Sequence, residues 1–124
     1  MKAIDANIIL RYIIKDNLKL FEISAKIIDN EEILIPGEIL LEVVYVLLKV
    51  YEIDRNKIKN SLINILNYPN ILIYDKELIE EALSIFASKN IDYADALLVS
   101  MNKIREFEIE TFDKKVKKII KKKK

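Results

Sequence analysis

Residues 1–10, MKAIDANIIL, combine a short apolar segment, an aspartate and the start of an apolar periodic run. Residues 2–4 have the Ile-rich character of a buried strand, and a helix is predicted to follow at once, over residues 6–15. A strand that leads directly into a helix is the repeating unit of a parallel sheet. Asp5 is therefore predicted to lie at the carboxyl end of a strand.

The same alternation of strand and helix continues along the chain. Further strands are predicted at residues 33–35, 71–74 and 108–111, and the last of these alternates with Glu, as a less buried edge strand would. Helices are predicted at residues 18–29, 37–51, 55–67, 76–89, 93–105 and 115–120, with Asp16, Asp54, Asp75 and Asp92 just before four of them. This pattern predicts an α/β fold with a parallel sheet covered on both faces, in a single domain over residues 1–124.

The chain contains neither Cys nor His. This excludes disulfides, Cys nucleophiles, Ser–His relays and ordinary zinc sites. Any acid–base or metal chemistry must then be carried by carboxylates. A composition that is 52% hydrophobic and 33% charged is that of a globular chain rather than a disordered one.

No uncharged apolar run approaches the roughly 20 residues that span a bilayer. The longest uncharged stretch, residues 60–74, is broken by Pro69 and by four Asn. Asp5 also interrupts the place where a signal peptide would need an unbroken apolar run. We therefore expect a cytoplasmic protein with no membrane partner.

Carboxylates follow several of the predicted strands. Asp5 ends the first strand, Glu42 lies in the helix after the second, and Asp113 follows the fourth. Asp92 and Asp95 lie at the start of the helix over residues 93–105. In open parallel sheets, ligands bind at the carboxyl ends of the strands, so these side chains are predicted to converge. Clustered carboxylates repel one another unless a cation neutralises them, and an all-oxygen site favours Mg²⁺ or Mn²⁺.

Each of these acids also has a purely structural interpretation. Asp5, Asp92 and Asp113 precede predicted helices and would serve as N-caps, while Asp95 would favour the helix dipole. Glu42 would lie on a polar stripe of its helix. Taken singly, no residue distinguishes the two interpretations.

Four segments resemble motifs of the PIN-domain family, in particular its VapC-like toxin ribonucleases. Residues 3–12, AIDANIILRY, resemble the family's D-x-N-x-x-L-R-Y start, and residues 36–47, PGEILLEVVYVL, resemble its Pro…E-x-x-Y-V-L helix. Residues 92–98, DYADALL, resemble its D-[FY]-A-D-A-L-L element, and residues 111–115, TFDKK, resemble its closing T-x-D-x-x motif. The four occur in family order, at family-like spacing, over essentially the whole chain. Ala6 departs from the pattern, because Ser or Thr is common there.

The resemblance implies a three-layer α/β/α sandwich with a central parallel sheet of four or five strands. It implies a metal-dependent endoribonuclease that uses Mg²⁺ or Mn²⁺, with the toxin role, the homodimer and the antitoxin partner that many members have. By motif position, the catalytic and metal-binding residues would be Asp5, Glu42, Asp95 and Asp113, supported by Asn7, Asp92 and Thr111.

Three other functions are compatible with parts of this pattern. A structure-specific DNA nuclease shares the sheet and the acidic cluster. Such enzymes usually need added arches or helices to bind DNA, and 124 residues leave little room for them. A non-catalytic PIN-type RNA-binding or scaffold module would be expected to have lost acids, and all four are present. A receiver-like signalling domain needs a fifth strand followed by Lys, which the sequence does not show.

Two surfaces are predicted to bind macromolecules. Eight of the 21 basic residues lie in the tail over residues 114–124, which leaves 13 basic against 20 acidic residues in the rest of the chain. A Lys-rich end can simply be solvated, but we expect it to add non-specific affinity for RNA phosphates, so that deleting residues 117–124 weakens RNA binding. The helices over residues 37–51 and 55–67 are apolar enough to hold a dimer interface.

Overall fold

The computed structural model describes residues 1–120, so residues 121–124 of the predicted basic tail lie outside the described part. The chain divides into two compact units, unit 1 (Met1–Tyr74) and unit 2 (Asp75–Lys124). The single domain expected over residues 1–124 stays a prediction. Within the described part, none of the helices combines the length and the apolar character needed to cross a membrane.

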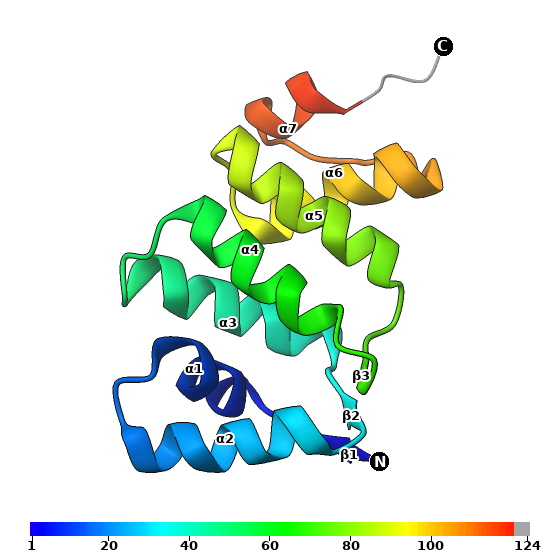
Figure 1. Cartoon of the computed structure of the whole chain (residues 1–124). Helices are drawn as coiled ribbons and strands as arrows, with labels where there is room; N and C mark the ends of the chain where they lie inside the picture. Colours follow the sequence, from blue (N-terminus) through cyan, green and yellow to red (C-terminus); the bar gives the residue numbers. More distant parts are fainter. Residues whose placement is uncertain (121–124) are drawn as a thin grey trace. The chain divides into compact units, whose positions relative to one another are not determined.

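Unit 1 alternates strands and helices around a small parallel sheet (Figure 1). Its strands are β1 (Lys2–Ala3), β2 (Ile33–Leu34) and β3 (Ile71–Leu72), and its helices are α1 (Ala6–Ile14), α2 (Leu18–Asn30), α3 (Gly37–Lys49) and α4 (Arg55–Leu66). The strand order is β1-β2-β3, and both pairs are parallel. The predicted α/β class and the parallel sheet are thereby confirmed, with strands shorter than expected.

The two faces of this sheet differ in exposure. The register places Ile33 beside Ile71 and Leu34 beside Leu72. Ile33 and Ile71 are buried, whereas Leu34 and Leu72 are 39% and 44% exposed. Because successive side chains of a strand point to opposite faces, the core of unit 1 lies on the Ile33 face.

Two helices of unit 1, α3 and α4, each bury apolar side chains along one face. α1 packs against α2 and α3, and α3 packs against α4. Leu40, Val43 and Leu47 of α3 are fully buried. Ile58 and Leu62 of α4 are each only 1% exposed. These positions recur at spacings of three and four residues, so each helix presents one face to the core.

Asn70 links the end of α2 to the loop before β3 through two hydrogen bonds. Its Nδ2 donates to the carbonyl oxygens of Ile28 at 2.6 Å and of Glu31 at 2.7 Å. Both carbonyls lie where α2 ends and the chain turns into β2, so one amide group satisfies two acceptors that the helix leaves open.

Unit 2 consists of three helices, α5 (Lys76–Lys89), α6 (Tyr93–Arg105) and α7 (Lys114–Ile119), among the residues described. α5 packs along α6, and α7 contacts α6 (Figure 1). Phe86 and Val116 are fully buried in this unit. Arg105, at the end of α6, donates to Asp75 and to Glu77 at the start of α5, with Nη1 2.9 Å from Glu77 Oε1.

The prediction of a strand over residues 108–111 is wrong. Residues 106–113 form neither helix nor strand, and the described part of unit 2 contains no other strand with which they could pair. The described residues therefore form three strands in place of the four or five expected.

Helix capping follows the predictions at α4 and α5 but not at α2. Asp54 and Asp75 accept backbone N–H groups at the starts of α4 and α5. The cap of α2 is Asn17, which accepts from Leu20 N at 3.1 Å, rather than Asp16. Asp16, one residue before this cap, pairs with Arg11 at 2.9 Å.

Candidate functional site

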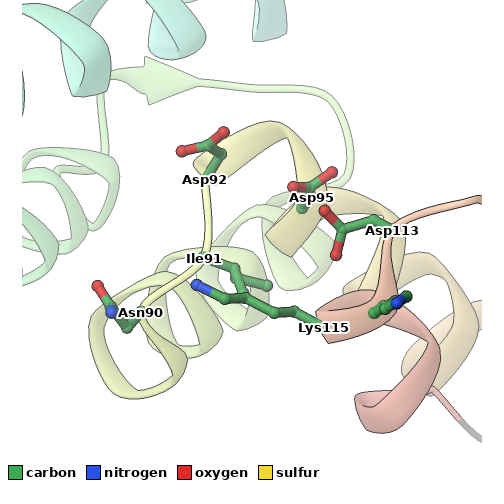
Figure 2. A pocket seen from close by; sticks show the side chains of 7 residues that line it. Asn90, Ile91, Asp92, Asp95, Asp113 and Lys115 are labelled. Atoms are coloured by element: carbon green, nitrogen blue, oxygen red, sulfur yellow. The ribbon is translucent and has the colours of Figure 1, made fainter.

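A hollow of about 410 Å³ in unit 2 contains three of the acids that the sequence singled out. It is lined by Asn90, Ile91, Asp92, Asp95, Asp113, Lys114 and Lys115. Figure 2 shows that the acids come from the start of α6 and from the segment before α7. This hollow, here called the acidic pocket, is the candidate site of unit 2.

The turn between α5 and α6 sets one wall of the acidic pocket. Asn90 ends α5 in the left-handed conformation, with φ of 51°, and Ile91 is buried directly after it. Asp92 occupies the N-cap position of α6, but its side chain makes no capping hydrogen bond. The expectation that Asp92 serves as a side-chain cap is therefore wrong, and its exposed carboxylate stays available to the pocket.

The opposite wall is the turn that starts α7. Asp113 Oδ1 accepts from Val116 N at 2.9 Å, so Asp113 caps this helix as its structural interpretation predicts. Asp113 N donates to Thr111 Oγ1 at 3.0 Å, which ties the predicted supporting residue Thr111 to the backbone of Asp113. The buried side chain of Val116 anchors the turn. Capping uses one oxygen of the carboxylate and leaves the other available for a ligand.

The electrostatics of the acidic pocket centre on Asp95. The carboxylates of Asp95 and Asp113 face each other across the hollow (Figure 2). Burial raises the pKa of Asp95, and the negative charges of Asp113 and Asp92 raise it further. Among residues 1–120, no hydrogen bond or ion pair holds the Asp95 carboxylate. A half-buried carboxylate beside two like charges, with no ion-pair partner among residues 1–120, would be stabilised by a cation that binds next to it.

Unit 1 holds the other predicted site residues, Asp5, Asn7 and Glu42. Asp5 follows β1 and accepts from Ile8 N at 3.3 Å, so it caps α1. Asn7 lies in the first turn of α1, and Glu42 lies in α3, which follows β2. Since β1 and β2 are parallel, all three belong to elements that leave the carboxyl edge of the sheet. Their side chains are exposed.

The donor chemistry of the acidic pocket fits a hard divalent cation. Asp95 and Asp113 offer oxygen ligands only, and Mg²⁺ and Mn²⁺ prefer such ligands. Within residues 1–120, no three carboxylates are already gathered as the ligands of one ion. The observation that supports the fit is the raised pKa of Asp95, caused by burial and by two like charges.

Sequence reasoning missed two residues of this pocket, Lys114 and Lys115. They were predicted only as part of the basic tail over residues 114–124, which is expected to contact RNA phosphates, although they directly follow Asp113 in the TFDKK segment. That adjacency was the available signal, because a side chain one or two residues after a site residue shares its turn. Asn90 and Ile91 carried no such signal, since the turn between α5 and α6 brings them to the pocket wall.

The structure thus combines a parallel sheet in unit 1 with a pocket lined by carboxylates in unit 2. The sequence model of the PIN domain matches residues 2–122, nearly the whole chain. The chain therefore belongs to the PIN domain family. PIN domains are generally nucleases that act on nucleic acids and typically use divalent metals. Searches of curated proteins and of solved structures gave no significant match.

Proposed function

We propose that this protein is a Mg²⁺- or Mn²⁺-dependent endoribonuclease whose catalytic centre comprises Asp5, Glu42, Asp95 and Asp113. The observation that carries the proposal is the acidic pocket, in which Asp95 has a raised pKa and no partner among the described residues. An enzyme without His or Cys must rely on carboxylates, and a cation site is the use of carboxylates that phosphodiester hydrolysis needs. We also propose that the whole chain adopts the three-layer α/β/α sandwich of the family.

The residues of the chain have separate tasks in this proposal. The four carboxylates would hold the metal, and a bound divalent ion would supply an activated water and positive charge beside the phosphate. Thr111 fixes the backbone of Asp113 through its hydroxyl group, 3.0 Å from Asp113 N. Asp92 adds negative charge beside Asp95, which strengthens the attraction for a cation. Asn7 orients water or a carboxylate near Asp5.

RNA as substrate, the toxin role and an antitoxin partner are supported by the resemblance of the four motifs to VapC-like proteins. The homodimer has one further support in the structure. α3 exposes Leu41 at 39% and Tyr45 at 61%, with Val50 at 65% just beyond its end. The apolar side chains of α4 lie in the core instead, so the surface proposed for a second copy is that of α3 alone.

The proposed activity is tested by RNA cleavage with purified protein. A panel of structured and single-stranded RNAs, with single-stranded DNA beside it, is incubated with Mg²⁺, with Mn²⁺ and with EDTA. An Asp95→Asn preparation exposes contaminating nuclease, and a Glu110→Gln preparation is the matched control, because Glu110 is an exposed acid of unit 2 outside the acidic pocket. We expect metal-dependent RNA cleavage that Asp95→Asn lowers at least about a hundredfold and Glu110→Gln leaves unchanged.

Other outcomes would contradict this function in distinct ways. Equal cleavage by the wild type and Asp95→Asn would mean that the activity comes from elsewhere. Cleavage of DNA in preference to RNA would favour the DNA nuclease. Absence of all cleavage, together with retained RNA binding, would favour the non-catalytic scaffold module.

A further inference from the structure

Two lysines lie in a pocket that is otherwise acidic. Lys114 and Lys115 line the same hollow as Asp92, Asp95 and Asp113. Both are exposed residues in the first turn of α7. Figure 2 shows the side chain of Lys115 extending towards Asn90 and Ile91 rather than towards the facing carboxylates of Asp95 and Asp113.

These lysines are not used as partners for the acids around them. Elsewhere in unit 2, cations that neutralise acids do so at short range, with Lys103 3.3 Å from Glu81 and Arg105 2.9 Å from Glu77. Within residues 1–120, neither Lys114 nor Lys115 forms an ion pair, although carboxylates line the same hollow. Their positive charges therefore stay available for an anion that enters the pocket.

The backbone that carries the two lysines is held in place. Asp113 caps α7 through Val116 N at 2.9 Å, and Val116 itself is fully buried. The first turn of α7 is thus fixed at both sides of Lys114 and Lys115. Two ammonium groups on a fixed turn, next to carboxylates that would hold a cation, can bind a phosphate without long-range rearrangement.

We propose that Lys114 and Lys115 bind a phosphate of the RNA backbone beside the proposed metal-binding carboxylates, and so act as substrate-positioning residues distinct from the rest of the basic tail. This inference rests on the proposed function, because RNA is the anion that the pocket would admit. The acids of the pocket repel a phosphate. The two lysines offset that repulsion beside the carboxylates, where the RNA bond to be cleaved would lie.

Lys117 and Lys118 provide a matched control within the same helix. They are exposed, they carry the same charge, and they do not line the acidic pocket. The double variant Lys114→Gln/Lys115→Gln and the double variant Lys117→Gln/Lys118→Gln therefore remove equal charge from α7. A difference between them reports the position of the charge rather than its amount.

The experiment measures binding of a fluorescent single-stranded oligouridylate in EDTA, by anisotropy, over a range of salt concentrations. Phosphate contacts do not depend on sequence, so this probe needs no knowledge of the target RNA. We expect the pocket variant to weaken binding about tenfold and to lower the salt slope by about 1.4, since each contact with a single strand contributes about 0.7. We expect the control variant to weaken binding less than about threefold, and Lys114→Arg/Lys115→Arg to restore it.

Equal weakening by the two Gln variants, or unchanged binding in the pocket variant, would overturn the inference. Lack of binding by the wild type at low salt would overturn it as well. Because this assay contains no metal and no cleavage step, its failure is separate from that of the proposed function. Loss of cleavage in Asp95→Asn together with equal binding by both lysine variants would leave the nuclease standing and remove only the role of the two lysines.

Discussion

Several polar side chains of unit 1 differ from those of the acidic pocket of unit 2. In unit 1, Asn70 donates to two carbonyls, Asp5 caps α1, and the hydroxyl of Tyr12 bonds to Asp29 and to Tyr68. In the acidic pocket of unit 2, Asp95 has no partner among the described residues and Asp92 makes no capping bond. Stability alone explains the placement of Asn70 and Tyr12, whereas a carboxylate with a raised pKa and no partner among the described residues is a candidate for function.

The largest effect on stability is expected in unit 1, at Asn70. Replacement by Ala leaves two carbonyl oxygens without their donor, so Asn70→Ala should lower the free energy of unfolding by about 2 to 3 kcal/mol. Urea unfolding measures the change, with Asn60→Ala on the exposed side of α4 as control. A loss of less than about 0.5 kcal/mol would show that the two bonds do not fasten this unit.

The next effect compares two aspartates that occupy N-cap positions. Asp5 accepts a capping bond and Asp92 does not. Asp5→Ala should therefore cost about 1 kcal/mol of stability, while Asp92→Ala should cost less than half of that. Equal losses in urea unfolding would mean that Asp92 caps α6 in solution, and the contrast between the units would weaken.

A smaller effect of opposite sign is expected at Asp95. In metal-free protein, Asp95→Asn removes a charge that burial and two neighbouring acids disfavour, so it should raise stability by less than about 1 kcal/mol. Thermal unfolding in EDTA measures this, and Glu110→Gln should show no such gain. A destabilised Asp95→Asn variant would contradict the view that the pocket is strained without a cation.

The smallest effect is a pH dependence at the ion pairs between α5 and α6. Hydrogen bonds from Arg105 hold the pKa of Asp75 below its ordinary value of 3.8. A carboxyl group with a lowered pKa in the folded state stabilises the fold above its unfolded pKa and loses that contribution as the pH falls through its folded pKa. Arg105→Gln should thus be less stable than the wild type near neutral pH, and the difference should shrink below pH 3.8. A difference that is independent of pH would assign the role of Arg105 to packing.

Much of the fold could be predicted from local pattern, because the signals were local. The apolar spacing of Ile58, Leu62 and Ile65 predicts the buried face of α4, and Asp54 and Asp75 mark the starts of the helices that follow them. The strand expected over residues 108–111 failed for a physical reason, since a strand exists only where a neighbour pairs with it. Alternation of Phe107 and Ile109 with Glu carries no information about that neighbour.

The candidate site was predictable in part, because its motifs are local in the sequence but its side-chain placement is not. The DYADALL and TFDKK segments led to Asp95 and Asp113, and the acidic pocket brings these two together. Sequence could not show that Asp92 leaves its capping position unused, because that depends on the rotamer of one side chain. The one sequence signal that separates Lys115 from Lys118 is its position two residues after Asp113, because both are lysines of one basic run.

The measurement that tests the central claim most directly is a titration of Mn²⁺ into metal-free protein, followed by electron paramagnetic resonance of the free ion. The wild type and Glu110→Gln are predicted to bind Mn²⁺ alike, and Asp95→Asn is predicted to bind it at least about tenfold more weakly. If Asp95→Asn bound Mn²⁺ as tightly as the wild type, the acidic pocket would not be the cation site and the proposed catalytic centre would be wrong.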